Sequence, residues 1–333
     1  MAAQNNAPLP DGLELAGYRI VKKIASGGFS IVYLAYDPDG NAVAIKEYLP
    51  SSLALRQPGE LAPVISKPNQ AVFRIGLKCF FEEGRALALI VHPNVVRVLN
   101  FFRANETVYM VMAYESGHAL QEHIARLQAK KLKPSEAFIR QLFTGVCGGL
   151  REVHANMLLH LDLKPANIYL RTDGTPILLD FGAARQTVNT DSPRVAPMYT
   201  PGFAPPELYV KASQLGPWTD IYSIGAAMYA CMAGTAPQPA DQRRVGDKMD
   251  PLINKLIAHY SVALVEMVRG CLALDPLARP QSVFALQKVL AVPAPAASAV
   301  TTAAPLEPAG DKPGGWRGLV DRLGTLGRKS NNT

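Results

Sequence analysis

The spacing of apolar residues changes close to Glu115, and this change limits the architectures open to the chain. From residue 18 to 114, short runs such as YRIVKKIA and SIVYLAY alternate β-branched and apolar residues with others, which is typical of strands. Beyond Glu115 the apolar residues recur every three or four positions over longer segments, which indicates helices. We therefore predict an α+β molecule of two lobes: a small antiparallel sheet, then a larger and mainly helical part.

Turn signals and one helical segment divide the first part. The DGN sequence at 39–41, between two apolar runs, predicts a hairpin turn. A helix follows that ends before His92-Pro93. One face of this helix is formed by Phe80, Glu83, Leu87 and Ile90. Residues 95–114 then predict two more strands.

The second part contains several helical patterns. Pro134 and Ser135 open a helix whose apolar stripe consists of Phe138, Leu142, Val146, Leu150 and Val153. Further helices are expected in TDIYSIGAAMYACMAG, in PLINKLIAHYSVALVEMVRGCLAL and in PQSVFALQKVLA. The longest apolar run, at 224–234, is much shorter than the roughly 20 residues that cross a bilayer, so we expect a buried helix there.

Composition excludes several classes of protein. A chain of 333 residues with 48% hydrophobic and 18% charged residues is typical of a globular protein. The N-terminus lacks a basic region followed by an apolar run, so a cytoplasmic location is expected. The four cysteines form no CxxC pair, which argues against a zinc site or disulfide framework. The net charge is +7, but no Lys/Arg block with interleaved aromatic residues indicates nucleic acid as a partner.

The ends of the chain differ in composition from its centre. Residues 1–17 are expected to be a flexible N-terminus, and 18–290 a domain whose lobes are 18–113 and 114–290. Residues 291–315 are rich in Ala, Pro, Ser and Thr and predict a linker. The tail at 316–333 is basic and amphipathic. It is either a helix that contacts a membrane surface or a partner, or a weakly structured solubilising segment.

Two N-terminal patterns suit the binding of a nucleotide. The sequence IASGGFSIVYLA at 24–35 is a glycine-rich turn between strands, and glycines let backbone amides approach phosphate oxygens. By itself this pattern also fits an ordinary hairpin. Lys46 ends the apolar run VAIK, where an ammonium group suits phosphate if a carboxylate holds it. Glu83 on the predicted helix is the best candidate for that carboxylate.

The second part supplies the groups that phosphoryl transfer requires. In HLDLKPAN, Asp162, Lys164 and Asn167 are suited to act as base, phosphate clamp and metal ligand. After an RTDGT turn, LLDFG places Asp180 at the end of an apolar strand, where it offers a second metal ligand. Phosphoryl transfer needs positioning and charge neutralisation more than covalent help from the protein, and these residue types provide both.

Taken together, residues 18–290 resemble a bacterial eukaryotic-like Ser/Thr protein kinase of the Hanks type. The resemblance rests on an ordered series of motifs, which is far more specific than any single match. After the glycine-rich turn the series contains VAIK, the helix Glu, HPNVV, VMAY, HLDLKPAN, DFG, TPGFAPPE, TDIYSIG and LDPLARP.

The resemblance implies roles for the catalytic residues. Lys46 would contact the α and β phosphates of ATP and pair with Glu83. Asp162 would accept or orient the proton of the substrate hydroxyl, and Lys164 would neutralise the γ-phosphate. Asn167 and Asp180 would hold Mg²⁺, with Mn²⁺ as an alternative. The residues implied to line the ATP site are Ile24, Ala25, Ser26, Gly27, Gly28, Ser30, Val32, Ala44, Lys46, Met112, Ala113 and Tyr114.

Other implied roles are structural or concern the substrate. Glu207 would pair with Arg279 and anchor the activation segment, and Asp220 would tie the catalytic loop to the central helix. Thr200 stands where Ser/Thr kinases place a threonine that contacts Asp162 and Lys164. Protein Ser and Thr hydroxyls are therefore the expected substrates.

The chain departs from the family pattern at the residue before Asp162. Many kinases have Arg there, and its guanidinium contacts a phosphorylated activation segment; Leu161 is unable to do so. We therefore expect an active kinase whose activity depends little on that phosphate. Autophosphorylation sites remain plausible at Thr187, Thr190 and Ser192.

Two more departures concern the N-terminal part. Ala25 and Ser30 replace glycines of the family pattern, which would crowd the phosphates modestly. The segment between Lys46 and Glu83 is unusually long, with an insertion at 51–78. This insertion is either a surface loop or an element that positions Glu83.

The sequence around the insertion resembles that of a subgroup of proteobacterial kinases, which are found beside metal-dependent protein phosphatases and type VI secretion components. A cognate phosphatase and a phosphothreonine-binding protein are therefore expected partners. Two alternatives stay open: a pseudokinase scaffold, and a small-molecule kinase of the same fold. The "PPE" anchor and Thr200 argue against the second.

Overall fold

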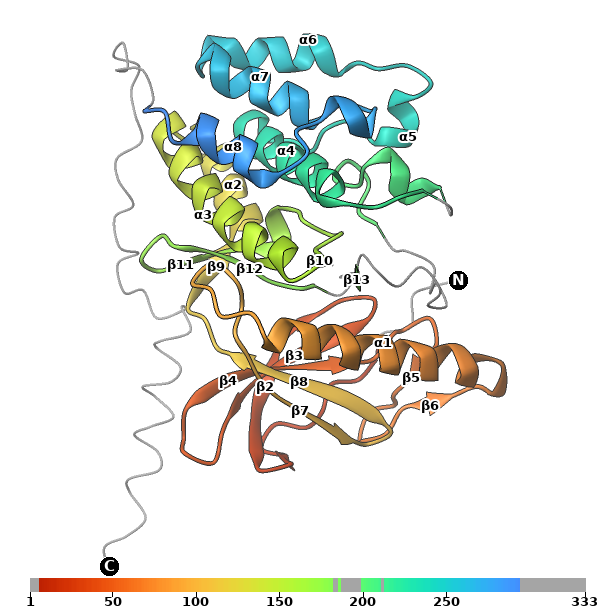
Figure 1. Cartoon of the computed structure of the whole chain (residues 1–333). Helices are drawn as coiled ribbons and strands as arrows, with labels where there is room; N and C mark the ends of the chain where they lie inside the picture. Colours follow the sequence, from red (N-terminus) through yellow and green to blue (C-terminus); the bar gives the residue numbers. More distant parts are fainter. Residues whose placement is uncertain (1–5, 182–184, 187–198, 211–212, 294–333) are drawn as a thin grey trace, which may run out of the picture.

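The computed structural model describes residues 6–181, 185–186, 199–210 and 213–293, which form two lobes (Figure 1). The lobe drawn at the bottom of Figure 1 contains an antiparallel sheet and one long helix, α1. The lobe above it is mainly helical. This arrangement confirms the predicted α+β architecture with a sheet-rich N-terminal lobe and a helical C-terminal lobe.

Six strands form the sheet of the N-terminal lobe, in the order β1-β2-β3-β4-β8-β7. They are β1 (Glu14–Leu15), β2 (Tyr18–Ser26), β3 (Ser30–Tyr36), β4 (Ala42–Tyr48), β7 (Val98–Ala104) and β8 (Thr107–Ala113). The Tyr18 ring at the start of β2 stacks on Phe102 of β7, with 5.7 Å between ring centroids. Because β2 and β7 are not neighbours in the sheet, this contact shows that the sheet curls and encloses a concave face.

Helix α1 (Gln70–Ala88) begins earlier than the sequence predicted and includes the end of the insertion. A small two-stranded sheet, β5 (Ala54–Leu55) with β6 (Val64–Ile65), precedes it. The buried side of α1 consists of Phe73, Gly76, Phe80, Gly84 and Leu87, which continue one stripe at spacings of three and four. Two glycines within this stripe weaken the apolar pattern, so the first turns of the helix gave little sequence signal.

The N-terminal segment differs from the expectation of a flexible end. Leu15 of β1 pairs with Tyr18, and Leu9 is only 1% exposed. The backbone amide of Leu9 donates to the Tyr33 hydroxyl at 3.1 Å. Residues from Asn6 onward therefore belong to the packed N-terminal lobe.

The C-terminal lobe is built around α4, whose side chains are buried along nearly its whole length. Its helices are α2 (Leu120–Ala129), α3 (Glu136–Ala155), α4 (Pro217–Ala233), α5 (Ala240–Arg243), α6 (Met249–Asn254), α7 (Val262–Cys271) and α8 (Val283–Leu290). The Ser135 hydroxyl caps α3 by accepting from the Phe138 amide at 3.2 Å. No helix in the described part of the chain is both long enough and apolar enough to cross a bilayer.

Short strands lie on the side of this lobe that faces the sheet (Figure 1). They are β9 (Gly117–Ala119), β10 (Leu158–Leu159), β11 (Ile168–Arg171), β12 (Pro176–Leu178) and β13 (Arg185–Gln186). The loop after α1 joins the two lobes through backbone hydrogen bonds from the Val96 amide to the Leu178 carbonyl at 3.0 Å and from the Leu178 amide to the Asn94 carbonyl at 2.8 Å.

Candidate active site

One face of the sheet carries most of the residues expected around the nucleotide base. Val32 on β3 lies opposite Lys46 on β4, and Ala44 lies opposite Met112 on β8. Because side chains alternate along a strand, all four point to the same face. The chain then continues through Ala113 and Tyr114 into the C-terminal lobe, so these four side chains lie close to the connection between the lobes.

The glycine-rich turn joins β2 to β3, with the Gly27 amide donating to the Ser30 carbonyl at 2.9 Å. Ile24, Ala25 and Ser26 end β2, and Ala25 pairs with Val32. The turn is also held from the insertion side, because the Ser51 amide donates to the Gly28 carbonyl at 2.9 Å.

Lys46 is 6% exposed, and its ammonium hydrogen-bonds Asp180. Burial alone would lower the pKa of Lys46, but the negative charges of Asp180 and Glu83 outweigh it and the pKa lies above its ordinary value. The same ammonium is the main reason that the pKa of Asp180 lies below its ordinary value. Lys46 and Asp180 therefore form a charged pair that joins the two lobes.

The expected pairing of Lys46 with Glu83 is not formed in this structure, although both residues are described. Glu83 Oε1 is inaccessible to solvent and has no hydrogen-bond partner in the described part of the chain. Burial raises the pKa of Glu83 well above its ordinary value, and the Lys46 charge opposes this only in part. Lys46 pairs with Asp180 instead of Glu83 because the two carboxyl groups compete for one ammonium group, and Asp180 forms the hydrogen bond.

Burial of the neighbouring Phe181 ring fixes the direction of Asp180. Phe181 is 2% exposed and packs on the His160 ring with 4.4 Å between centroids. The backbone at Asp180 has a φ of 57°, in the left-handed region. With Phe181 buried, the Asp180 carboxylate faces Lys46 and stays about half exposed.

Asp162, Lys164 and Thr200 form a triangle of hydrogen bonds. Lys164 Nζ donates to Asp162 Oδ2 at 2.7 Å and to Thr200 Oγ1 at 2.8 Å. The Thr200 hydroxyl donates to Asp162 Oδ1 at 3.1 Å. Asn167 Nδ2 donates to Asp162 at 2.8 and 3.1 Å, which leaves the amide oxygen of Asn167 available to a cation.

The buried Asp220 of α4 positions the backbone of this loop. Its two carboxylate oxygens accept from the amides of His160 at 2.9 Å and Leu161 at 2.8 Å. Burial alone would raise the pKa of Asp220, but hydrogen bonds from His154 and from the backbone keep it below its ordinary value. A charged Asp220 thus ties the catalytic loop to the central helix.

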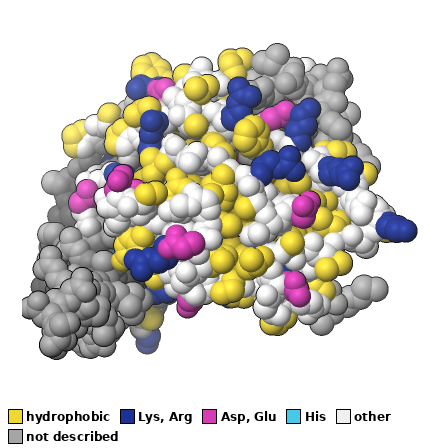
Figure 2. Space-filling view, turned by 90° about the horizontal axis from the view of Figure 1, so that it is seen from below, with side chains coloured by type: hydrophobic (Ala, Val, Ile, Leu, Met, Phe, Trp, Pro, Cys, Tyr) yellow, Lys and Arg dark blue, Asp and Glu magenta, His cyan; other side chains and the backbone are white. Residues whose placement is uncertain are grey.

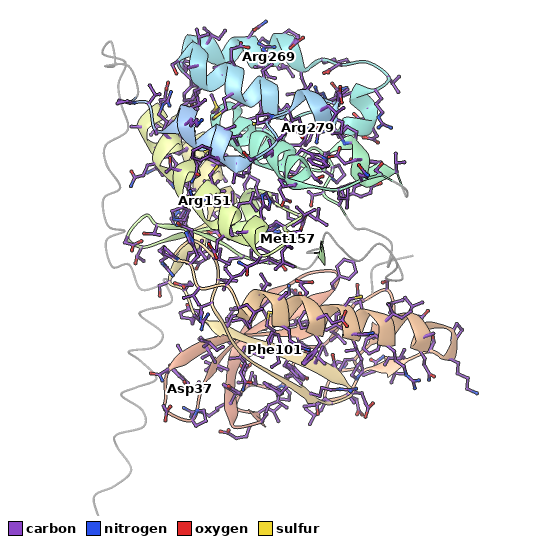
Figure 3. The ribbon with its side chains drawn as sticks, in the orientation of Figure 1. Asp37, Phe101, Arg151, Met157, Arg269 and Arg279 are labelled. Atoms are coloured by element: carbon purple, nitrogen blue, oxygen red, sulfur yellow. The ribbon has the colours of Figure 1, made fainter. Side chains whose placement is uncertain are left out.

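Leu161 is 5% exposed, and its φ is 63°. Its side chain packs in a small apolar cluster with Leu159, Ala204 and Leu208. Between these last two residues lies Glu207, whose carboxylate forms two hydrogen bonds with Arg279 at 2.7 and 3.0 Å. The stretch 204–208 is therefore fixed on one side by the catalytic loop and on the other by the buried Arg279, which lies among the helices of the upper lobe in Figure 3.

The donors present fit a nucleotide and a divalent cation. Asp180 and Asn167 offer hard oxygen ligands of the kind that Mg²⁺ prefers. Lys46 and Lys164 place cationic groups beside these oxygens, and a glycine-rich turn lies in the opposite lobe.

One residue of the site was missed by sequence reasoning. Tyr169 lies on β11 between Ile168 and Leu170, which are fully buried, so strand alternation turns its ring to the opposite side. Burial raises the pKa of Tyr114, and the nearby Tyr169 adds to this shift. Tyr169 therefore lies near Tyr114, on the side of β11 opposite to Ile168 and Leu170. Its position in the sequence, two residues after Asn167, was the signal that could have indicated its place near the site.

The possible phosphosites Thr187, Thr190 and Ser192 lie outside the described residues, as does the tail at 316–333.

Comparison with known proteins agrees with this geometry. A solved structure described as the PpkA-294 apo form is 35% identical, with a TM-score of 0.74; the match covers 85% of this chain and 99% of that one. The Mycobacterium tuberculosis PknI kinase domain, 23% identical with a TM-score of 0.62, covers 85% of this chain and 98% of its own and shares the fold.

Curated relatives include human serine/threonine-protein kinase 16, which is 26% identical over 86% of this chain and 93% of its own length. The Xenopus laevis hormonally up-regulated neu tumor-associated kinase homolog A is 30% identical over 80% of this chain and 36% of its own length. The chain thus spans about a third of that relative. The family model for the protein kinase domain matches residues 18–291. The chain belongs to the protein kinase family.

Proposed function

We propose that this protein transfers the γ-phosphoryl group of ATP to Ser and Thr hydroxyls of protein substrates, with Mg²⁺ held by Asn167 and Asp180. The observation that carries the proposal is the triangle of Asp162, Lys164 and Thr200, in which base, cation and hydroxyl lie within 2.7–3.1 Å of one another.

In the proposed reaction Asp162 orients the substrate hydroxyl and accepts its proton, as the hydroxyl oxygen bonds to the γ-phosphorus and the bond to ADP breaks. Lys164 neutralises charge on the transferred group, and Lys46 binds the α and β phosphates. Bound MgATP supplies the phosphoryl group, and the cation offsets oxygen charge. The contact of Thr200 with both Asp162 and Lys164 supports Ser and Thr as acceptors.

The experiment is a labelling assay on the full chain with γ-labelled ATP, Mg²⁺ and a generic protein substrate, followed by phosphoamino-acid analysis. Asp162→Asn should lower turnover by about 10²-fold or more, because it removes the base but keeps the shape. Asp241→Asn, at an exposed aspartate of α5, is the matched control and should match the wild type. Nucleotide binding without turnover by the wild type would instead support the pseudokinase scaffold.

We also propose that activity depends little on phosphate in the activation segment. The apolar cluster around Leu161 supports this, because it joins the catalytic loop to Ala204 and Leu208 without any charged contact. Replacing Thr187, Thr190 and Ser192 together by Ala should leave turnover of an added substrate within about threefold of the wild type. A loss by orders of magnitude would contradict this part of the proposal.

A metal-dependent phosphatase and a phosphothreonine-binding protein are the proposed partners, on the basis of the sequence resemblance. Phosphorylated chain should then be dephosphorylated by a metal-dependent protein phosphatase, whereas the unphosphorylated Asp162→Asn variant should bind no phosphothreonine-binding protein.

A further inference from the structure

The insertion between Lys46 and α1 contains an arginine that is completely buried. The Arg56 side chain has no exposed surface, and neither has its partner Glu47. Charged side chains at the surface of this lobe are spread among apolar ones (Figure 2). The Arg56–Glu47 pair differs from these surface charges because it is buried against the concave face of the sheet. Burial of a charged pair is tolerated only where other groups satisfy its hydrogen bonds.

All five N–H groups of the Arg56 guanidinium have acceptors. Nη1 donates to Glu47 Oε1 at 2.5 Å and to the Leu61 carbonyl at 3.3 Å. Nη2 donates to Glu47 Oε2 and to the Tyr33 hydroxyl, both at 2.8 Å. Nε donates to the Ala7 carbonyl at 2.8 Å. Arg56 thus contacts β3, β4, the insertion and the N-terminal segment at one point.

Glu47 connects this network to the nucleotide site. It follows Lys46 directly on β4, so the two side chains point to opposite faces of the sheet. Glu47 also accepts from Tyr33 of β3 at 2.7 Å and from Tyr109 of β8 at 2.8 Å. The strand position of Lys46 is therefore fixed from behind by hydrogen bonds to both neighbouring strands.

Residues 6–9, here called the strap, complete the network. The Asn6 side chain accepts from the Arg56 amide at 2.6 Å, and the Ala7 amide donates to the Arg56 carbonyl at 3.1 Å. The Leu9 amide donates to the Tyr33 hydroxyl. Without the strap, the Nε and backbone amide of Arg56 would lose their acceptors.

The insertion also contacts the two other parts of the nucleotide site. The Ser51 amide donates to the Gly28 carbonyl in the glycine-rich turn. At the other end the Asn69 side chain, next to the start of α1, donates to the Leu53 carbonyl at 3.3 Å. One segment thus contacts the turn, the strand that bears Lys46 and the helix that bears Glu83.

We propose that Arg56, with the strap of residues 6–9, is a positioning device for the ATP site: through Glu47 it sets the place of Lys46, and through the insertion those of the glycine-rich turn and α1. This inference rests on the proposed function only in that ATP is the nucleotide concerned. A purely structural role would lower stability alone. The positioning role also requires weaker ATP binding in variants that remain folded.

Two readouts on the full chain separate these roles: the KM for ATP with kcat, and the dissociation constant of a non-hydrolysable ATP analogue with Mg²⁺ by calorimetry. Tyr33→Phe is the mild variant, because it keeps the ring and removes only the hydroxyl that contacts Glu47, Arg56 and Leu9. Deletion of residues 2–9 is the second. Both should weaken analogue binding and raise the KM for ATP by about tenfold or more, because small displacements of positioning groups have large effects.

The matched control is Arg140→Met, compared with Arg56→Met. Arg140 is also buried and contacts a carboxylate, Glu136, as well as the Val289 carbonyl and the Ser261 hydroxyl, but in the C-terminal lobe. We expect lower melting temperatures for both, with weaker nucleotide binding only for Arg56→Met. If Arg56→Met does not fold, Tyr33→Phe and the deletion decide the question.

Unchanged analogue binding in Tyr33→Phe and in the deletion variant would overturn the proposal, as would an equal loss in Arg140→Met. The binding arm does not require turnover. If the wild type binds the analogue but shows no kinase activity, the proposed reaction fails while the positioning role is still tested.

Discussion

At Leu161 the backbone conformation is unfavourable, whereas the burial of the side chain is favourable. A positive φ disfavours leucine by about 1 kcal/mol or more relative to glycine, yet the side chain is buried among apolar groups. The hydrogen bond from its amide to Asp220 holds the backbone in this conformation. Packing in the cluster therefore outweighs the strain.

The contribution of this packing can be measured with Leu161→Ala. We expect it to lower the free energy of unfolding by about 2–4 kcal/mol and to reduce turnover, because the cavity loosens the contact with Leu208. Denaturant unfolding and initial-rate kinetics test both effects. Leu277→Ala, at a leucine that is 83% exposed, should change neither. Equal behaviour of the two variants would contradict the importance of the cluster.

Asp220 predicts a pH dependence with a definite sign. Its folded pKa lies below the ordinary value of 3.8, so the charged carboxylate stabilises the fold above that pH, and this stabilisation is lost as the pH falls through the folded value. Asp220→Asn also replaces one acceptor by a donor that faces a backbone N–H, at a cost of about 1–3 kcal/mol.

The stability difference between wild type and Asp220→Asn should therefore be full at neutral pH and shrink in strong acid. Urea unfolding of both proteins at several pH values tests this. A difference that grows as the pH falls would contradict the role assigned to the Asp220 charge.

At the scale of elements, α1 packs closely on the sheet at the point where Gly84 faces Phe101. A Cβ added to Gly84 would lie 2.1 Å from the Phe101 ring and 2.8 Å from Met110 Cε. Phe101 is labelled beside α1 in Figure 3. Gly84 thus sets the distance between the sheet and the helix turn that carries Glu83.

Gly84→Ala should push α1 away from the sheet and lower kinase activity, although alanine is the better helix former. The measurement is kcat/KM for ATP, with melting temperature alongside. Gly270→Ala in α7, where a Cβ would meet no atom within 4 Å, is the matched control and should raise stability by about 1 kcal/mol. If Gly84→Ala behaved like Gly270→Ala, the close approach would be unimportant.

Sequence reasoning predicted the elements with strong local signals. The strands of the sheet alternate clearly, and Ser135 marks the start of α3. The motif residues Asp162, Lys164 and Thr200 were expected to meet, and the structure brings them together. These predictions succeeded because each residue type carries its constraint in a short, ordered motif.

Other features depend on groups that are distant in the sequence. Whether Lys46 pairs with Asp180 or with Glu83 is decided by the relative placement of the lobes and by the burial of the Glu83 carboxyl group. Arg56 stands in a Pro-rich segment with no local pattern, and its four contacting segments meet only in the folded lobe. Local periodicity carries no information on such pairings.

At the scale of the whole molecule, the loop at 92–96 joins the lobes at a point apart from the Ala113–Tyr114 connection. Asn94 contributes twice: its carbonyl accepts from Leu178, and its side chain donates to the Pro176 carbonyl at 2.7 Å. Gly149 of α3 allows this approach, since a Cβ there would lie 2.7 Å from the Asn94 carbonyl oxygen. The loop is therefore a second attachment of the backbone between the lobes, beside the side-chain pair of Lys46 and Asp180.

Asn94→Ala should loosen this second attachment. Loss of the side-chain bond should cost about 1 kcal/mol and speed hydrogen exchange at the amides of Val96 and Leu178. Asn100→Ala removes a bond to Tyr18 within the N-terminal lobe and is the control, with no effect expected at those two amides. Equal exchange in both variants would show that the loop is held by its backbone bonds alone.

The buried network of Arg56 also bears on how this chain is made. Its members extend from Asn6 to Tyr109, so the network is complete only after about a third of the chain has left the ribosome. Pairings so distant in sequence are slow to form, because loop closure precedes any gain from the contact. The strap is thus synthesised long before β8, which carries the last member of the network, so the network closes late in the synthesis of its lobe.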